Sequence, residues 1–348
     1  MVSFTQFVDF KIGTLHSWTS KKLRFLLSDA TIITLTGRMS TFRIRTMPIL
    51  ENKQNNNVFS GIVTQADIAK YLPPNIDFLP ISVLRAKNFD FTELREGSKA
   101  FESKTIADVF EEVLNLGERD RKIAVIDTKT TFLEAINQFT EVGIRNRRYR
   151  TLVIYNEGTC NGVLSYIDVF NIFLSPDYRT SIEGFLRSKI KDVLPEKSIT
   201  FLTDEDSLAN VISIFDNNPF THIPVSSKVS NDIIGLVDDI TARSLQYDVI
   251  YDCVEDMQLK DILEIQRPNF KDMTILETDT IEDALKKFTQ SKTRPKTLLI
   301  GTLNSVNFIV SGLSNTLSYV DVMRLFLTFA KKQMLSQLSL KVDLPKDS

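Results

Sequence analysis

The chain has 348 residues, of which 43% are hydrophobic and 25% charged, a globular composition long enough for two domains of average size. Its net charge of -2 lacks the basic excess that a nucleic-acid partner requires, so nucleic acid is not expected to bind. The sequence has no apolar run of about 18 residues and no signal-peptide pattern at its start, so neither a membrane span nor a signal peptide is expected.

The first feature met along the chain is a short segment that recurs four times. Each copy opens with a basic or polar residue, continues with alternating apolar positions and leads into an apolar, strand-like stretch. The segments lie at 22–27, 105–110, 189–194 and 258–263, and the strands are expected at 31–35, 123–126, 199–202 and 273–276. Such self-similarity predicts a repeat architecture.

An amphipathic helix is expected after each of the last three of these strands. Apolar residues recur every three or four positions at 132–139, 207–215 and 281–288, as one buried helix face requires. The first copy differs, because the stretch between Ile33 and Pro48 leaves little room for a full helix. We therefore expect a degenerate first repeat.

Two short β-branched strands and a second helix complete each copy. The second helices are expected to begin at Asp67, Asp168, Ile240 and Asp321. The last of them keeps helical spacing of apolar residues beyond Phe329 and is expected to continue there.

These elements predict an α/β (α+β) protein of four βαββα repeats. One repeat buries too little surface to be secure alone, so the repeats are expected to pair as two modules in a disc-like assembly. The predicted limits are 11–72 for the first repeat, 73–103 for an inserted linker that opens with two prolines, 104–176 for the second repeat, 177–250 for the third, 251–332 for the fourth and 333–348 for a C-terminal tail.

A seven-residue pattern precedes the second helices: Gly, two apolar residues, Ser or Thr, two further residues, and Asp. It runs from Gly61 to Asp67 and from Gly162 to Asp168. The fourth repeat ends in the same way but has Asn315 in the glycine position. In the third repeat, Asp238 stands in the Ser/Thr position and Thr241 in the Asp position.

With this pattern the chain resembles the CBS-domain (Bateman module) family, and its four repeats resemble the AMP-activated kinase gamma subunit and archaeal four-repeat relatives. The resemblance covers most of residues 22–332. It implies that the Asp holds the two ribose hydroxyls of a bound adenosine, and that the Ser or Thr lies beside the sugar or phosphate. The positions implicated are Thr64, Asp67, Ser165, Asp168, Ser318 and Asp321.

A capping box offers an interpretation of the same pattern without a ligand, because Ser/Thr-x-x-Asp before an apolar helix satisfies free backbone N–H groups. The third repeat bears on this choice. Asp238 can still cap its helix, while the acid three residues later has become Thr241. Folding thus does not require an acid at that position, which favours ligand binding for the other three. The third ribose pocket is expected to be empty or to hold a differently placed ligand.

Basic residues precede the strand that would face the cleft in each repeat. The resemblance implies phosphate contacts for such residues, and arginine suits phosphate by its fork geometry. A solvated loop or a salt-bridged rim is the alternative. The candidates are Arg148 and Arg150, which alternation places on one face of the strand, together with His222, Arg294 and Lys296; Arg43 and Arg45 hold the same place in the first repeat.

The expected function is a non-catalytic sensor that binds AMP, ADP or ATP and couples ligand occupancy to a protein partner, such as a regulated kinase, enzyme or transporter. A CBS-fold scaffold with unoccupied sites, a sensor of S-adenosylmethionine and a homodimer remain open. The sequence shows no Ser/His/Asp arrangement and no phosphate-binding Gly-rich loop, so an enzyme is not expected.

Cysteine and histidine content bears on cofactors and location. Cys160 and Cys253 are too few for a disulfide framework, which favours a reducing, cytoplasmic setting. His16 and His222 lie far from both cysteines, so no zinc site and no metal cofactor is expected.

Overall fold

A computed structural model describes residues 2–15, 24–42, 44, 46–53, 56–64, 67–68, 103–114, 122–143, 149–157, 159–218, 220, 222–230, 232–238, 258–260, 270–291, 295, 297–303 and 310–342. Several predictions fall outside these residues. They concern the insertion at 73–102, most of the second helix in repeats 1 and 3, and the side chains of Arg43, Arg45, Arg148, Thr241, Arg294 and Lys296.

The first two repeats each form a small three-stranded sheet. In both, the first strand runs parallel to the second, to which a helix connects it, and the second and third strands form an antiparallel hairpin. Repeat 1 contains β1 (Leu26–Leu27), α3 (Ile32–Phe42), β2 (Thr46–Lys53) and β3 (Asn56–Thr64). Repeat 2 contains α7 (Ile106–Leu114), β4 (Val125–Asp127), α9 (Phe132–Thr140), β5 (Thr151–Asn156), β6 (Thr159–Ser165) and α10 (Tyr166–Leu174).

The last two repeats share one six-stranded sheet of order β10-β11-β12-β9-β8-β7, because Val310 of β12 pairs with Ile233 of β9. Repeat 3 contains α13 (Ile190–Val193), β7 (Leu202–Thr203), α14 (Leu208–Asn217), β8 (His222–Ser226) and β9 (Ile233–Asp238). Repeat 4 contains α17 (Phe270–Met273), β10 (Thr274–Ile275), α18 (Ile281–Gln290), β11 (Thr297–Leu303), β12 (Val310–Ser318) and α19 (Tyr319–Val342).

Four backbone bridges at equivalent positions pair repeat 1 with repeat 2 and repeat 3 with repeat 4. Each bridge joins the leading segment of one repeat to the residue before the first helix of its partner. The bridges are Lys11↔Thr131, Thr31↔Thr105, Lys189↔Thr280 and Ser207↔Gln258. Because each pair exchanges the contact in both directions, the two members are related by an approximate two-fold axis.

The first repeat corrects two predictions. Its leading segment is the one at Lys11, not 22–27, since Leu26 and Leu27 form the first strand. The stretch 31–35 is not a strand, and there is room for a full first helix: α3 spans 11 residues. Burial of Ile32, Leu35 and Met39 on one side of α3 outweighs the β-branched composition that favoured a strand. The other three predicted first strands overlap β4, β7 and β10.

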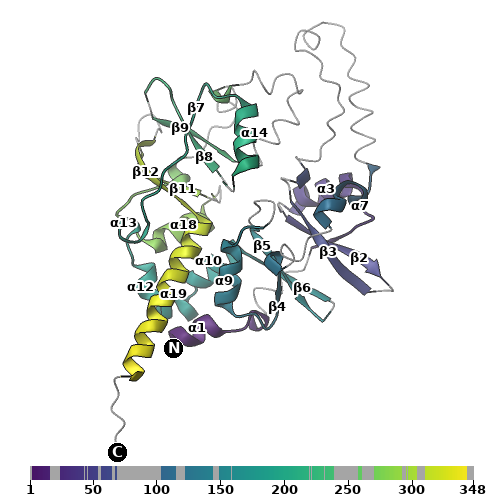
Figure 1. Ribbon diagram of the computed structural model, residues 1–348, viewed down its shortest axis with the longest axis horizontal. Coiled ribbons are helices and arrows are strands. Elements are labelled where there is room, and N and C mark those ends of the chain that lie inside the picture. Colours follow the sequence, from purple (N-terminus) through teal and green to yellow (C-terminus); the bar gives the residue numbers. More distant parts are fainter. Residues whose placement is uncertain are drawn as a thin grey trace, which may run out of the picture.

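The largest core lies between repeats 2 and 4, where α10 packs on α18 and α19 packs on α9 (Figure 1). The N-terminal helix α1 (Phe4–Asp9) joins it. The ring of Phe7 is fully buried and lies against Phe132, Phe173 and Phe326. The predicted extension of the last helix is confirmed, and Gln337 on that extension accepts a hydrogen bond from Thr5 of α1 at 3.1 Å.

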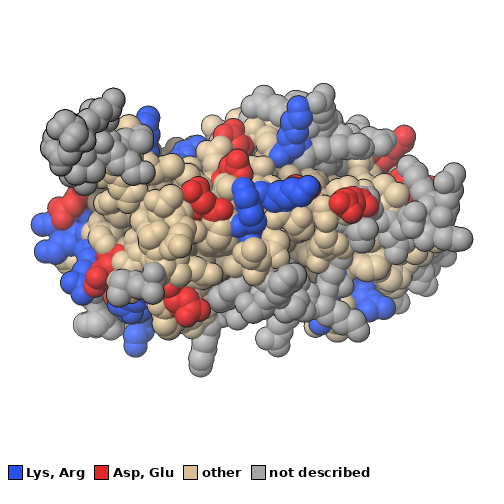
Figure 2. Space-filling model, turned by 90° about the horizontal axis from the view of Figure 1, so that it is seen from below, with Lys and Arg blue, Asp and Glu red and all other residues tan. Residues whose placement is uncertain are grey.

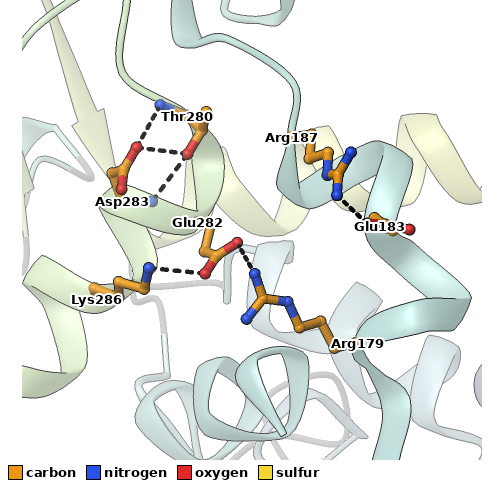
Figure 3. Close-up of polar contacts among 7 residues, drawn as sticks. All are labelled: Arg179, Glu183, Arg187, Thr280, Glu282, Asp283 and Lys286. Atoms are coloured by element: carbon orange, nitrogen blue, oxygen red, sulfur yellow. Dashed lines mark hydrogen bonds and ion pairs between the residues drawn. The ribbon is translucent and has the colours of Figure 1, made fainter. Parts of the chain in front are cut away.

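A side-chain ion pair holds the connector between the two repeat pairs against repeat 4. It consists of α11 (Pro176–Arg179), the 3-10 turn η2 (Thr180–Ile182) and α12 (Glu183–Leu186). Figure 3 shows Arg179 and Lys286 approaching Glu282 of α18, at 2.6 Å and 2.8 Å. Glu282 is buried, so two cations neutralise a carboxylate that would otherwise be costly to desolvate.

The described surface carries charges of both signs. On the face drawn in Figure 2, basic and acidic side chains are interspersed rather than gathered into one patch. Among the described residues, every helix is too short or too polar to cross a membrane.

Candidate functional site

The three predicted Ser/Thr–Asp pairs all close the same small ring at the start of a second helix. In each, one carboxylate oxygen, Oδ2, accepts hydrogen bonds from the backbone N–H and the hydroxyl of the residue three positions earlier. The N–H of the Asp in turn donates to that hydroxyl. The paired atoms are 2.5–2.9 Å apart in the bonds to Oδ2 and 3.2–3.3 Å apart in the return bond, in the pairs Thr64–Asp67, Ser165–Asp168 and Ser318–Asp321.

The same ring occurs on a first helix that has no predicted ligand role. Thr280 and Asp283 at the start of α18 form it with distances of 2.6–3.2 Å (Figure 3). Burial raises the pKa of Asp283, but the hydrogen bonds from Thr280 outweigh this, and the net pKa is lowered. Capping therefore explains the hydrogen bonds at Oδ2, whereas any ligand role concerns the second oxygen, Oδ1.

The strand register places the Ser/Thr position of each motif, which opens the capping box, beside the start of the neighbouring strand. The first residue of the middle strand pairs with the last residue of the third strand in every repeat: Thr46 with Thr64, Thr151 with Ser165, His222 with Asp238 and Thr297 with Ser318. Two of the residues predicted to meet phosphate are described at these strand starts: Arg150 directly precedes Thr151, and His222 is itself the first residue of β8. The register thus places these two residues at the same sheet end as the boxes.

Arg150 is the described member of the predicted arginines in repeat 2. Its carbonyl accepts a hydrogen bond from the N–H of Tyr166, the residue after Ser165, at 3.2 Å. The backbone of Arg150 therefore lies directly beside the Ser165–Asp168 box. Its side chain is partly exposed.

His222 connects the third repeat with the fourth. Its Nε2 lies 3.7 Å from Oδ2 of Asp238, and its Nδ1 lies 3.2 Å from the hydroxyl of Thr297 at the start of β11. The imidazole is almost completely buried. The two strand starts of this pair therefore meet, and Asp238, expected only as a helix cap, also faces a histidine.

Lys197 is a site residue that the sequence reasoning missed. Its Nζ lies 2.6 Å from Oδ1 of Asp321, the oxygen that the cap does not use. The contact joins residues 124 positions apart, from the stretch between α13 and β7 to the start of α19. A local sequence pattern carries no signal for such a contact, since the two residues are distant in the chain and belong to different repeats.

The donor set of these sites suits hydrogen bonding to an organic ligand rather than metal coordination. Among the described residues it combines carboxylates, hydroxyls, the ammonium of Lys197 and the guanidinium of Arg150. Within the described ranges, no three His, Cys, Asp or Glu side chains come together as a metal site would require.

Comparison with known proteins places this arrangement in a known fold. The sequence matches no protein-family model, and none of the curated proteins compared with it is a match. A structure from Methanocaldococcus jannaschii, described as a proposed archaeal homologue of g-AMPK, superposes with a TM-score of 0.60 at 15% identity, over 90% of this chain and 99% of that one.

Two further solved structures match with lower scores. An uncharacterised conserved protein of Pyrococcus horikoshii has a TM-score of 0.49 at 11% identity, over 91% of this chain and 100% of its own. A CBS-domain-containing protein of Agrobacterium tumefaciens has 0.31 at 13% identity, over 48% of this chain and 95% of its own. The predicted mixed α/β fold of four repeats is confirmed, and the chain has the fold of the four-repeat CBS-domain proteins.

Proposed function

We propose that the chain is a non-catalytic regulatory protein that binds an adenine nucleotide, AMP, ADP or ATP, and passes ligand occupancy to a protein partner. The observation that carries the proposal is the threefold recurrence of one arrangement. A carboxylate fixed through Oδ2 stands at the start of a second helix, beside a strand start preceded by basic residues.

The chemistry of each group suits one part of a nucleotide. A carboxylate accepts two hydrogen bonds from the cis-diol of a ribose. The helix start beside it favours a phosphate through its N–H groups and the positive end of the helix dipole. Arg150, whose backbone adjoins the Ser165 box, would add a guanidinium to that phosphate. The second repeat therefore offers the most complete set among the described residues.

A scaffold with empty sites is the second candidate, and one observation favours it. The ring at Thr280 and Asp283, on a first helix, has the same hydrogen bonds as the three candidate boxes. If capping is the only role of the pattern, these three carboxylates need no ligand. A binding experiment must therefore separate capping from ligand recognition.

Asp168→Asn makes that separation. The asparagine retains one oxygen that can accept from Ser165, so the cap persists, while an amide NH2 replaces the other acceptor. Calorimetric titration with AMP and ATP should show binding weakened roughly 10- to 150-fold, as expected for hydrogen bonds to a charged group worth about 1.5–3 kcal/mol. Asp283→Asn is the matched control, because it changes an equivalent cap on a first helix and should leave binding unchanged.

The ligand itself supplies a second test. 2′-Deoxy-AMP lacks one hydroxyl of the diol and should bind the parent protein more weakly than AMP, but the Asp168→Asn variant should discriminate little between the two. S-adenosylmethionine keeps the diol and tests whether phosphate is required. Native mass spectrometry would count bound ligands. Absence of binding by all of these compounds would favour the scaffold.

A further inference from the structure

The fourth repeat differs from the others at the glycine position of its motif. Asn315 occupies it and is buried. Its side-chain amide donates to the carbonyl of Pro195 at 3.0 Å, and its side-chain oxygen accepts from the N–H of Thr316 at 2.8 Å. Gly61 and Gly162, the equivalents in repeats 1 and 2, have no side chain with which to make such a bond. Asn315 thus fixes the stretch between α13 and β7 on β12.

This attachment places Lys197 beside the Ser318–Asp321 capping box of the fourth repeat. Two residues beyond Pro195, the ammonium of Lys197 lies 2.6 Å from Oδ1 of Asp321 and 3.4 Å from the carbonyl of Thr316. Ser318 holds the other oxygen, Oδ2, of the same carboxylate. The side chains of Lys197 and Asp321 are 32% and 13% exposed, so the ion pair is only partly screened by water.

We infer that Lys197 is an internal competitor for the ribose-binding oxygen of Asp321. The inference rests on the proposed function, because it concerns the carboxylate that would hold the ribose. Both carboxylate oxygens of Asp321 have partners within the chain. A nucleotide must therefore exchange an ion pair for hydroxyl donors that carry no charge, and so lose the attraction between the opposite charges of Lys197 and Asp321. The fourth site consequently binds adenine nucleotides more weakly than its sequence motif indicates.

Because Lys197 must first be displaced, the fourth site fills only at a higher nucleotide concentration than it would without this lysine. Lys197 belongs to repeat 3 and Asp321 to repeat 4, so ligand entry breaks a contact between the two repeats of the pair. Filling the site thereby frees the ammonium of Lys197, while the bond from Asn315 to Pro195 still holds the stretch before β7 on β12. Loss of the Lys197–Asp321 contact would therefore signal that a nucleotide occupies the fourth site.

Lys197→Met tests the inference, because methionine keeps an unbranched side chain and removes the cation. Titration with AMP in a background that carries both Asp67→Asn and Asp168→Asn reports on the fourth site. Removal of Lys197 should strengthen AMP binding at the fourth site on the order of fivefold, which corresponds to about 1 kcal/mol. Asn315→Gly should act in the same direction. Lys191→Met, an exposed lysine on the neighbouring α13, is the matched control and should change nothing.

The outcomes separate the inference from the proposed function. Unchanged or weaker binding at the fourth site on Lys197→Met substitution in this background, with AMP still bound by the chain that retains Asp168, overturns the inference alone. Absence of nucleotide binding in the parent and in all variants overturns both. Acetic anhydride labelling followed by mass spectrometry reads the contact directly: Lys197 should react more slowly than Lys191, and faster after Asp321→Asn or saturation with AMP. Equal reactivity of Lys197 with and without AMP would contradict displacement.

Discussion

The ion cluster on the connector gives a sharp test of how the two repeat pairs are joined. Glu282 receives Arg179 from the connector and Lys286 from its own helix (Figure 3). We expect a double-mutant cycle of Arg179→Ala and Glu282→Ala to give a coupling energy of about 1 kcal/mol in unfolding free energy. The control for this cycle is a second ion pair at the end of the connector, between Arg187 and Glu183.

The magnitude follows from exposure. A hydrogen bond to a charged group is worth about 1.5–3 kcal/mol when both partners are desolvated. The side chain of Glu282 is only 11% exposed, but that of Arg179 is 52% exposed, so water recovers part of the loss and about 1 kcal/mol remains. Arg187 and Glu183 are 76% and 47% exposed and lie four residues apart on the chain, so their cycle should give about 0.3 kcal/mol.

Urea unfolding followed by circular dichroism would supply the four free energies of each cycle. High salt should reduce the control coupling more than the Arg179–Glu282 coupling, because the control pair is more exposed to screening ions. A coupling for Arg179 and Glu282 no larger than that of Arg187 and Glu183 would refute the argument that burial of Glu282 makes this contact matter.

Three further predictions concern the core, the buried thiol and the capping carboxylates. Phe7→Ala should lower the unfolding free energy by about 3–5 kcal/mol, because Phe7 is fully buried, whereas Phe25→Ala, at a 39% exposed phenylalanine, should cost far less; similar urea midpoints would contradict the assigned core. Burial raises the pKa of Cys160 to about 11, so peptide mapping should find it unlabelled by a thiol reagent at pH 8 until urea unfolds the chain, and rapid labelling of the native protein would be unexpected. Hydrogen bonds from Thr280 hold the folded pKa of Asp283 below its ordinary value despite burial, so this carboxylate stabilises the fold above the ordinary pKa of an aspartate and its contribution is lost as the pH falls through the lowered pKa. Acid titration of Asp283→Asn should show a shallower loss of stability, and a curve parallel to the parent's would exclude the effect.

Local periodicity was sufficient for the helices of repeats 2 and 4. The pattern at 132–139 gives α9 within one residue, and that at 281–288 gives α18 within two, because both have a single apolar face and a Thr capping box. The first helix of repeat 1 has no such clarity. Its stretch contains Ile, Thr and Gly37, residues that local propensity disfavours in helices, and burial of Leu35 and Met39 decides its structure.

The contacts of the candidate site likewise fall into two groups, local ones that the sequence predicts and contacts between repeats that it does not. Contacts within three residues, such as Ser165 with Asp168, could be predicted because one helical turn brings them together. Lys197 with Asp321 and His222 with Thr297 could not, since they join different repeats and depend on how the repeats are packed. The implied phosphate ligands, Arg150 and His222 as well as Arg148, Arg294 and Lys296, stay predictions, as do the limits proposed for the repeats.

The packing of α1 against α19 has a consequence for the order in which the chain can acquire its structure during synthesis. Phe7 and Phe326 touch in the finished core, and Phe4 lies against Phe329. A ribosome adding about 5–20 residues per second needs roughly 15 to 60 seconds to travel from one to the other. Throughout that interval the first phenylalanines lack part of their final neighbours. Part of this aromatic surface therefore stays uncovered until α19 emerges, and packing of this helix completes the core that α1 began.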